Sequence, residues 1–298
     1  MMQNTLHILL LNQWAMPLGL LIGLFVFILG AVAGSFAGVV VTRLPLSLLA
    51  HAHDVQSSDP NVLGSYTTPT LAYPRSHCWH CSTQLRVIHT IPLISYLLLK
   101  GECSYCKKPI GFSLFAIELL SALWWTFCFL QYGLSGAFLV FSVYGSALLC
   151  LAFIDGQTQL LPDAITQPLL WAGLITSSIG VGNLSLNLSL FGAVLGYCVL
   201  WIISRAYLII KGEVGLGDGD LKLVAAIGAW IGPFALIALI LIASLSGILA
   251  ALILRFKEKM NPGDYIPFGP FLVASALLIQ ALLSPNYYHL LIDKLGGF

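Results

Sequence analysis

The amino-acid sequence predicts an all-α, polytopic membrane protein with one inserted polar loop, and three observations favour this class. Hydrophobic residues make up 58% of the 298 residues and charged residues only 8%, whereas a typical soluble domain has about a quarter charged residues. The mean hydropathy is +0.93. Long apolar runs recur along the chain, each near the roughly 20 residues that a helix needs to cross a bilayer.

The apolar runs predict about eight transmembrane helices. The run 221–254 is too long for one upright helix, but Gly232-Pro233 in its middle favours a break into two. Ala31-Val32-Ala33 superficially resembles a signal-peptidase site, yet no Lys or Arg precedes it and the apolar stretch is long, so we expect a retained span. The expected helices lie near 17–41, 114–132, 135–154, 165–182, 187–210, 222–232, 234–254 and 267–284.

The basic residues predict the orientation of these helices, because cytoplasmic loops are enriched in Lys and Arg. With eight spans and the N-terminus outside, all but Lys294 of the 13 Lys and Arg residues lie in or beside cytoplasmic segments. A single helix over 221–254 would instead place the 255–259 basic cluster outside. We therefore expect a multi-pass inner-membrane protein in contact with the lipid bilayer. The net charge of +1 gives no indication of a nucleic-acid partner, and none is expected.

The chain divides into three predicted regions. Residues 1–41 form the first transmembrane segment, residues 42–112 form a cytoplasmic loop domain, and residues 113–298 form the main transmembrane core. The shorter polar segments 155–163, 211–220 and 255–264 are expected on the same face as the loop domain. The sequence carries no signal for an oligomeric state.

Four cysteines of the loop domain have the spacing of a metal site. Cys78 and Cys81 form one C-x-x-C pair, and Cys103 and Cys106 form a second pair, separated from the first by 21 residues. Two such pairs suit a tetrahedral four-thiolate Zn²⁺ site, in which the closed coordination makes the metal structural. Disulfides or a redox-active pair are the alternatives, but the predicted cytoplasmic location is reducing and no βαβ pattern surrounds the motif.

Two aspartates at helix ends are the candidate catalytic groups. Asp155 directly follows an apolar run, and Asp220 lies in a glycine-rich segment just before the next span, so both are expected at the cytoplasmic face. Two carboxylates in a partly desolvated site share a proton, so that one acts as a base and the other as an acid toward water and a peptide bond. The alternatives are ordinary helix-end charges or a cation site.

These segments resemble the paired signature of type IV prepilin peptidases. They read Asp155-Gly-Gln-Thr-Gln-Leu-Leu-Pro-Asp163 and Gly217-Asp-Gly-Asp-Leu-Lys222. Further landmarks of the family are similar to segments of this chain in the same order, namely 34–36, 43–45, the two C-x-x-C pairs, 91–96 and 267–271. The resemblance covers residues 34 to 272, about four-fifths of the chain.

The resemblance implies an activity and a set of site residues. Asp155 and Asp220 would be the catalytic aspartates, the latter in the Gly-x-Gly-Asp element of other intramembrane aspartyl proteases, and 113–298 would be the protease core. The expected reaction is cleavage of the basic leader of prepilins or pseudopilins after a Gly, followed by N-methylation of the new N-terminus with S-adenosylmethionine, for which no binding residue is implied. The supporting motif residues are Asp163, Lys222, Gly217 and Gly219.

Two points stay open at this stage. Glu118 matches a family Glu, but a helix-end acid that reaches the membrane interface is the alternative. A membrane cation transporter is the rival function, since Asp155 and Asp220 can also line an ion pathway. That rival accounts for paired acids and glycine breaks. It does not account for both acids and all four thiols lying at one face.

Overall fold

The fold is all-α within the residues described by this computed structural model, which are 2–56, 70–73, 75–181, 184–213, 215–256 and 266–283. The elements are α1 (Met2–Gln56), the 3-10 helix η1 (Val87–Thr90), α2 (Ile94–Leu98), α3 (Phe112–Tyr132), α4 (Gly136–Thr158), α5 (Asp163–Ser178), α6 (Leu186–Lys211), α7 (Asp218–Phe256) and α8 (Gly269–Leu282). The predicted class is confirmed. Of the basic residues used for the topology, Lys257, Lys259 and Lys294 lie outside the described ranges.

Five of the described helices are long and apolar enough to cross a membrane, namely α1, α3, α4, α6 and α7. The predicted count of eight spans is not confirmed, because α5 has 16 residues and α8 has 14. The predicted break in the long run is present: α7 spans 39 residues, and Gly232 within it has the non-helical angles φ 77° and ψ 175°. A Gly followed by Pro233 tolerates both the positive φ and the lost backbone hydrogen bond.

The chain forms two compact units, and the first comprises residues 1–38 and 75–142. Within it, α1 runs very close to α3. A Cβ on Gly34 would lie 2.6 Å from the Cα of Glu118, and a Cβ on Gly30 would lie 2.7 Å from the Cβ of Trp125. Glycines four residues apart on one helix face allow this backbone approach.

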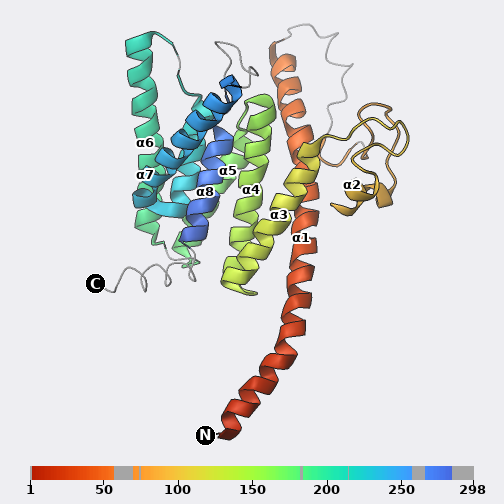
Figure 1. Ribbon diagram of the computed structural model, residues 1–298. Coiled ribbons are helices and arrows are strands. Elements are labelled where there is room, and N and C mark those ends of the chain that lie inside the picture. Colours follow the sequence, from red (N-terminus) through yellow and green to blue (C-terminus); the bar gives the residue numbers. More distant parts are fainter. Residues whose placement is uncertain are drawn as a thin grey trace. The chain divides into compact units, whose positions relative to one another are not determined.

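The second unit comprises residues 39–74 and 143–298 and contains α5 to α8 with most of α4 (Figure 1). Its centre is the first half of α7, in which every residue from Leu223 to Gly232 is buried. Gly228 meets Gly192 of α6 backbone to backbone. The Trp230 indole donates to the Leu169 carbonyl of α5 at 2.9 Å and lies 4.4 Å from the ring of Tyr144 in α4. The helices that carry the two predicted catalytic aspartates are therefore packed together.

Candidate functional site

Asp155 lies in the last turn of α4, where its side chain meets the start of α8. The residue is only 5% exposed. Its Oδ2 accepts a hydrogen bond of 2.9 Å from the backbone N–H of Gly269, the first residue of α8. The N-terminus of a helix carries partial positive charge, which attracts the carboxyl oxygen.

Gly269 has to be a glycine for this contact to form. A Cβ at this position would lie 2.6 Å from the Asp155 Oδ2 and 3.0 Å from its Cγ. The carboxyl group would have to move away from the helix end. Gly269 thus fixes the position of the Asp155 carboxyl group, a role that the sequence did not reveal although 267–271 was identified as a family landmark.

Asp220 lies in the first turn of α7, and its carboxyl group is close enough to Asp155 to interact electrostatically. Its Oδ1 is buried and has no hydrogen-bond partner among the described residues. A buried acceptor without a partner requires an explanation, and in a candidate active site a bound water or substrate group is a sufficient one. The structure thus brings the two predicted aspartates together, from positions 65 residues apart.

The glycines of the Gly217-x-Gly219-Asp220 segment differ in their surroundings. A Cβ on Gly219 would lie 2.9 Å from the Cβ of Leu161, so the segment passes directly against the loop that joins α4 to α5. A Cβ on Gly217 would lie 3.7 Å from the Asp220 Oδ2, which is ordinary contact. Gly219 therefore permits a close approach, and Gly217 leaves space beside the carboxyl group.

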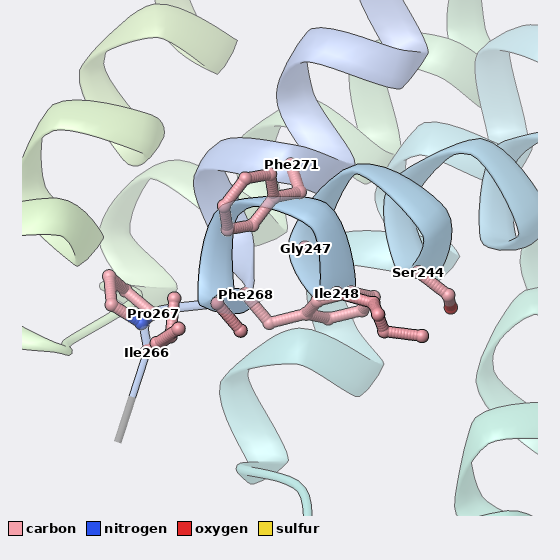
Figure 2. A pocket seen from close by; sticks show the side chains of 8 residues that line it. Ser244, Gly247, Ile248, Ile266, Pro267, Phe268 and Phe271 are labelled. Atoms are coloured by element: carbon pink, nitrogen blue, oxygen red, sulfur yellow. The ribbon is translucent and has the colours of Figure 1, made fainter. Parts of the chain in front are cut away.

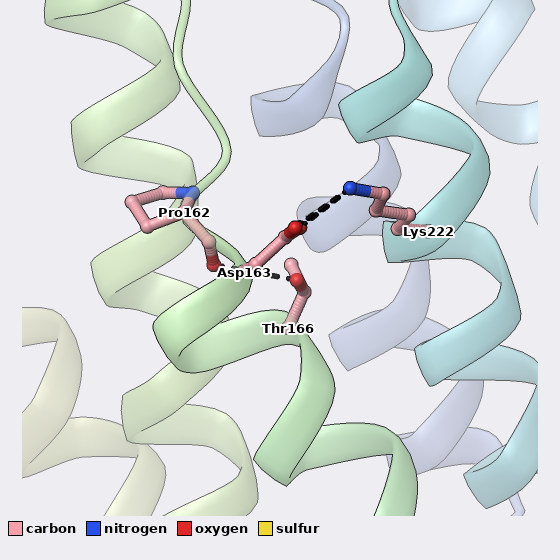
Figure 3. A network of polar contacts seen from close by, with 4 residues as sticks. All are labelled: Pro162, Asp163, Thr166 and Lys222. Carbon is pink, nitrogen blue, oxygen red and sulfur yellow. Dashed lines mark hydrogen bonds and ion pairs between the residues drawn. The ribbon is translucent and has the colours of Figure 1, made fainter. Parts of the chain in front are cut away.

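Asp163 and Lys222, the other charged residues of the two motifs, form an ion pair (Figure 3). The Lys222 Nζ donates to both carboxylate oxygens of Asp163, at 2.8 and 2.7 Å. Asp163 begins α5, and Lys222 is in the first turn of α7. The pair links the starts of these two helices, but it is partly exposed, with 35% of the Lys222 side chain and 57% of the Asp163 side chain accessible.

An apolar groove lies between the second half of α7 and the segment that leads into α8 (Figure 2). Its volume is about 310 Å³, and Phe268, which directly precedes Gly269, forms part of its wall. A groove with such a lining accepts apolar side chains. Its lining residues are Ser244, Gly247, Ile248, Ala251, Ile266, Pro267, Phe268 and Phe271.

The four predicted metal-binding cysteines lie together in the first unit. Their sulfur atoms are all within 4.8 Å of one another, and the Sγ atoms of Cys78 and Cys106 are 3.8 Å apart. A tetrahedral site with Zn–S bonds of about 2.3 Å has S–S edges of about 3.8 Å. The donor set and its spacing therefore fit Zn²⁺. We call these four residues the thiol cluster.

Two turns with the same backbone pattern carry the thiol cluster. The Cys78 N–H donates to the Thr83 carbonyl at 3.0 Å, and the Cys103 N–H donates to the Lys108 carbonyl at 2.9 Å. The fifth residue of each turn, Ser82 or Lys107, has a positive φ, 55° or 58°. Each pair is thus held in a tight local turn, and the second repeats the geometry of the first.

Hydrogen bonds and burial shift the pKa values of Cys81, Cys103 and Cys106 in different directions. Bonds from the Thr83 hydroxyl and N–H lower the pKa of Cys81 to about 6. The N–H groups of Cys106 and Tyr105 lower the pKa of Cys103. For Cys106, the Lys108 N–H lowers the pKa, but burial and the three neighbouring sulfurs outweigh it and raise the pKa to about 11. A bound cation would balance the charge of four thiolates in this space.

Glu118 connects the loop to α3, a role that sequence reasoning missed. Its Oε2 accepts a 2.8 Å hydrogen bond from the Leu93 N–H, and its carboxyl group is also hydrogen-bonded to Ser35 of α1. Leu93 has a positive φ of 62°, which no local motif of the sequence signals. The alternative of a side chain that merely reaches the interface does not describe this contact.

The architecture and the paired acids define a multi-pass membrane protein with an aspartic-protease-like site, and sequence comparison identifies the family. Residues 28–132 match the model of the bacterial peptidase A24 N-terminal domain, and residues 142–252 match that of the type IV leader peptidase family. No solved structure matches the chain significantly.

Curated relatives cover nearly the whole chain. A prepilin leader peptidase/N-methyltransferase of Burkholderia pseudomallei is 38% identical over 92% of this chain and 89% of its own length. The proteins of the same name from Neisseria gonorrhoeae and Pseudomonas aeruginosa are 37% and 39% identical, over 90% and 82% of this chain and 91% and 85% of their own lengths. The chain belongs to the type IV leader peptidase family.

Proposed function

We propose that this chain removes the leader peptide of type IV prepilins or pseudopilins at the cytoplasmic face of the inner membrane, with Asp155 and Asp220 as the catalytic pair. The observation that carries the assignment is the close pair of carboxyl groups, of which Asp155 is buried and Asp220 is half-buried. The Asp155 Oδ2 is engaged by the Gly269 N–H, while the Asp220 Oδ1 is buried without a partner in the described chain. A water can donate to that oxygen, or the protonated Oδ1 can donate to a peptide carbonyl.

The pair supports acid–base hydrolysis of a peptide bond. One carboxylate accepts a proton from water as the water oxygen attacks the carbonyl carbon. The other, protonated carboxyl group donates its proton to the carbonyl oxygen, which gives a gem-diol. As the C–N bond breaks, the first carboxyl group passes its proton to the departing amine and a gem-diol hydroxyl returns a proton to the second carboxylate. Asp163 and Lys222 position the start of α7, and Gly217 and Gly219 let the substrate and the α4–α5 loop approach Asp220.

The relatives' name suggests the second activity, N-methylation of the new N-terminus with S-adenosylmethionine as the methyl donor. The thiol cluster would hold a structural Zn²⁺ through Cys78, Cys81, Cys103 and Cys106. Four thiolates leave no open coordination position, so the ion contributes folding energy to the loop.

The test is a reaction with purified protein in nanodiscs. A peptide with a basic leader and a Gly-Phe junction is incubated with and without S-adenosylmethionine, and mass spectrometry identifies the cleaved and methylated products. Cleavage at the junction supports the proposal. Intact peptide, combined with cation flux through the same protein in liposomes, would support the transporter instead.

The cytoplasmic location is tested at the two ends of α6 in a chain otherwise free of cysteine. Lys211→Cys is expected to react only with reagents that cross the membrane, and Ser185→Cys is expected to react from outside. The reverse pattern would contradict the proposed orientation.

A further inference from the structure

The segment that follows the first cysteine turn exposes an unusual run of apolar side chains. Residues 87–99 contain no Lys, Arg, Asp or Glu, and they lie between Arg86 and Lys100. Exposed apolar surface of this extent, rimmed by polar residues, marks an interaction site. The exposed side chains are Val87 84%, Ile88 62%, Ile91 39%, Ile94 55%, Leu97 64% and Leu98 75%.

Contacts within the first unit hold this segment against the side of the transmembrane helix α3. The Leu93 N–H is bound by Glu118, and the Tyr96 ring stacks on Phe115 with centroids 4.8 Å apart. Glu118 and Phe115 lie six and three residues inside α3, which corresponds to about 9 and 5 Å along its axis. Leu93 and Tyr96 therefore lie alongside the first two turns of α3.

The length of α3 determines where those turns lie in the bilayer. The helix has 21 residues and is about 32 Å long, and the hydrocarbon core is about 30 Å thick. The helix is barely longer than the hydrocarbon core is thick, so its first turns lie at the boundary between hydrocarbon and headgroups. At that level Phe112 has 67% of its surface exposed, and the exposed side chains of α2 are available to lipid there.

The charges beside the apolar run fit an anionic membrane surface. Residues 75–111 contain the cations Arg75, Arg86, Lys100, Lys107 and Lys108 and the single acid Glu102. All six side chains are exposed. Cations at the ends of an apolar interfacial segment can reach lipid phosphates while the apolar side chains stay in the acyl region.

We propose that residues 87–98 insert into the membrane interface at the N-terminal end of α3, as a monotopic anchor for the loop that carries the thiol cluster. The partner is an anionic lipid surface, bound through the apolar side chains of η1 and α2 and through Arg86 and Lys100. The loop is thus held by the lipid on one side and by the Glu118–Leu93 hydrogen bond on the other. This inference depends on the fold alone and not on the proposed activity.

The test measures the depth of one side chain in nanodiscs that contain phosphatidylglycerol and phosphatidylcholine. Leu98→Cys is labelled with the fluorophore NBD in the metal-loaded chain, after Cys128, Cys150 and Cys198 are replaced by Ala. The matched control is Gln84→Cys, an exposed position of the same loop among polar neighbours. Zinc content and melting temperature verify that both chains are folded.

The expected result is at least twofold quenching of the Leu98→Cys label by lipids with a nitroxide at acyl carbon 5, with little quenching by aqueous iodide. The Gln84→Cys label should show the reverse. Quenching by iodide alone at Leu98 would overturn the proposal. Protection from both quenchers would also overturn it, since it would indicate a protein partner such as a second copy.

The charge component has its own test in the same chain. Arg86→Gln combined with Lys100→Gln should lower lipid quenching at Leu98 in phosphatidylglycerol nanodiscs to the level seen with phosphatidylcholine alone. Unchanged quenching in that variant would remove anionic lipid from the proposal and contradict it as stated.

Discussion

The four thiols at 78–106 are brought together by two short turns, whereas the carboxyl groups of Asp155 and Asp220 are brought together by the packing of whole helices. In the first case the backbone hydrogen bonds that shape each turn join residues four to nine positions apart. In the second, the hydrogen bond that fixes Asp155 comes from Gly269, 114 residues away. A local site can be lost or restored by itself, but a site built by packing is sensitive to small changes at distant positions.

The largest effect is expected at the carboxylates themselves. Asp155→Asn and Asp220→Asn each remove one ionisable half of the pair, so peptide cleavage should fall by about a hundredfold to ten-thousandfold. Asp218→Asn, one of the other acids of the same segment, is the matched control and should retain most activity. Initial rates in nanodiscs measure the effect. Near wild-type cleavage by either of the first two variants would exclude the proposed pair.

Gly269→Ala tests whether the acidic site is held from a distance. The added methyl group would come within 2.6 Å of the Asp155 Oδ2, so the carboxyl group must shift. A displacement of about 1 Å costs about a hundredfold in rate. We expect kcat to fall by that order with little change in KM.

Gly156→Ala is the control for that substitution, because its Cβ would meet only the Pro270 Cγ, at 3.8 Å. It changes a glycine adjacent to the same aspartate and should leave kcat within about threefold of wild type. Equal losses in the two variants would mean that the Gly269 contact has no special role.

The same contrast explains how much the sequence could predict. Cys78, Cys81, Cys103 and Cys106 were identified as a cluster because local spacing is enough to bring them together. The break at Gly232 was predicted because Gly-Pro is a local signal. Asp155 and Asp220 were candidates from their positions at helix ends and were identified as the catalytic pair by resemblance. The contact of Gly269 with Asp155 was not predicted, since no local pattern shows which distant backbone N–H meets a carboxylate.

The other features that the sequence did not predict have similar physical causes. Hydropathy predicted eight spans, but it does not determine where a short helix such as α5 or α8 begins and ends. The Leu93–Glu118 bond depends on a positive φ at a leucine, which residue preferences do not predict. Packing between distant segments decides each of these features.

Replacing either cysteine pair tests whether the thiol cluster is an independent, locally formed metal site. Cys78→Ser with Cys81→Ser, or Cys103→Ser with Cys106→Ser, removes two of four ligands, so zinc should fall from about one per chain to almost none in both variants. Because the two turns are equivalent, the pairs should fail alike. Elemental analysis and limited trypsin digestion of the loop measure the loss.

The acidic site belongs to the other unit, so cleavage should fall less than methyl transfer in these variants if the loop helps to hold S-adenosylmethionine or to present the new N-terminus. Cleavage as low as in Asp220→Asn would contradict the independence of the two sites. A metal-free wild type with four alkylatable thiols would refute the zinc assignment.

The smallest expected effect is at the Asp163–Lys222 ion pair. The pair is exposed, but it joins the starts of two helices that are distant in the sequence. An exposed pair contributes about 0.2–1 kcal/mol. Asp163→Lys or Lys222→Asp alone should therefore lower cleavage by about two- to fivefold, since each leaves two like charges facing each other across the starts of α5 and α7. The double reversal restores the attraction with its ends exchanged and should recover at least half of the lost rate. High salt screens exposed charges, so the single variants should approach wild type at about 1 M NaCl. If the double reversal is as slow as the worse single variant, the residues act through another contact and the ion pair does not position Asp220.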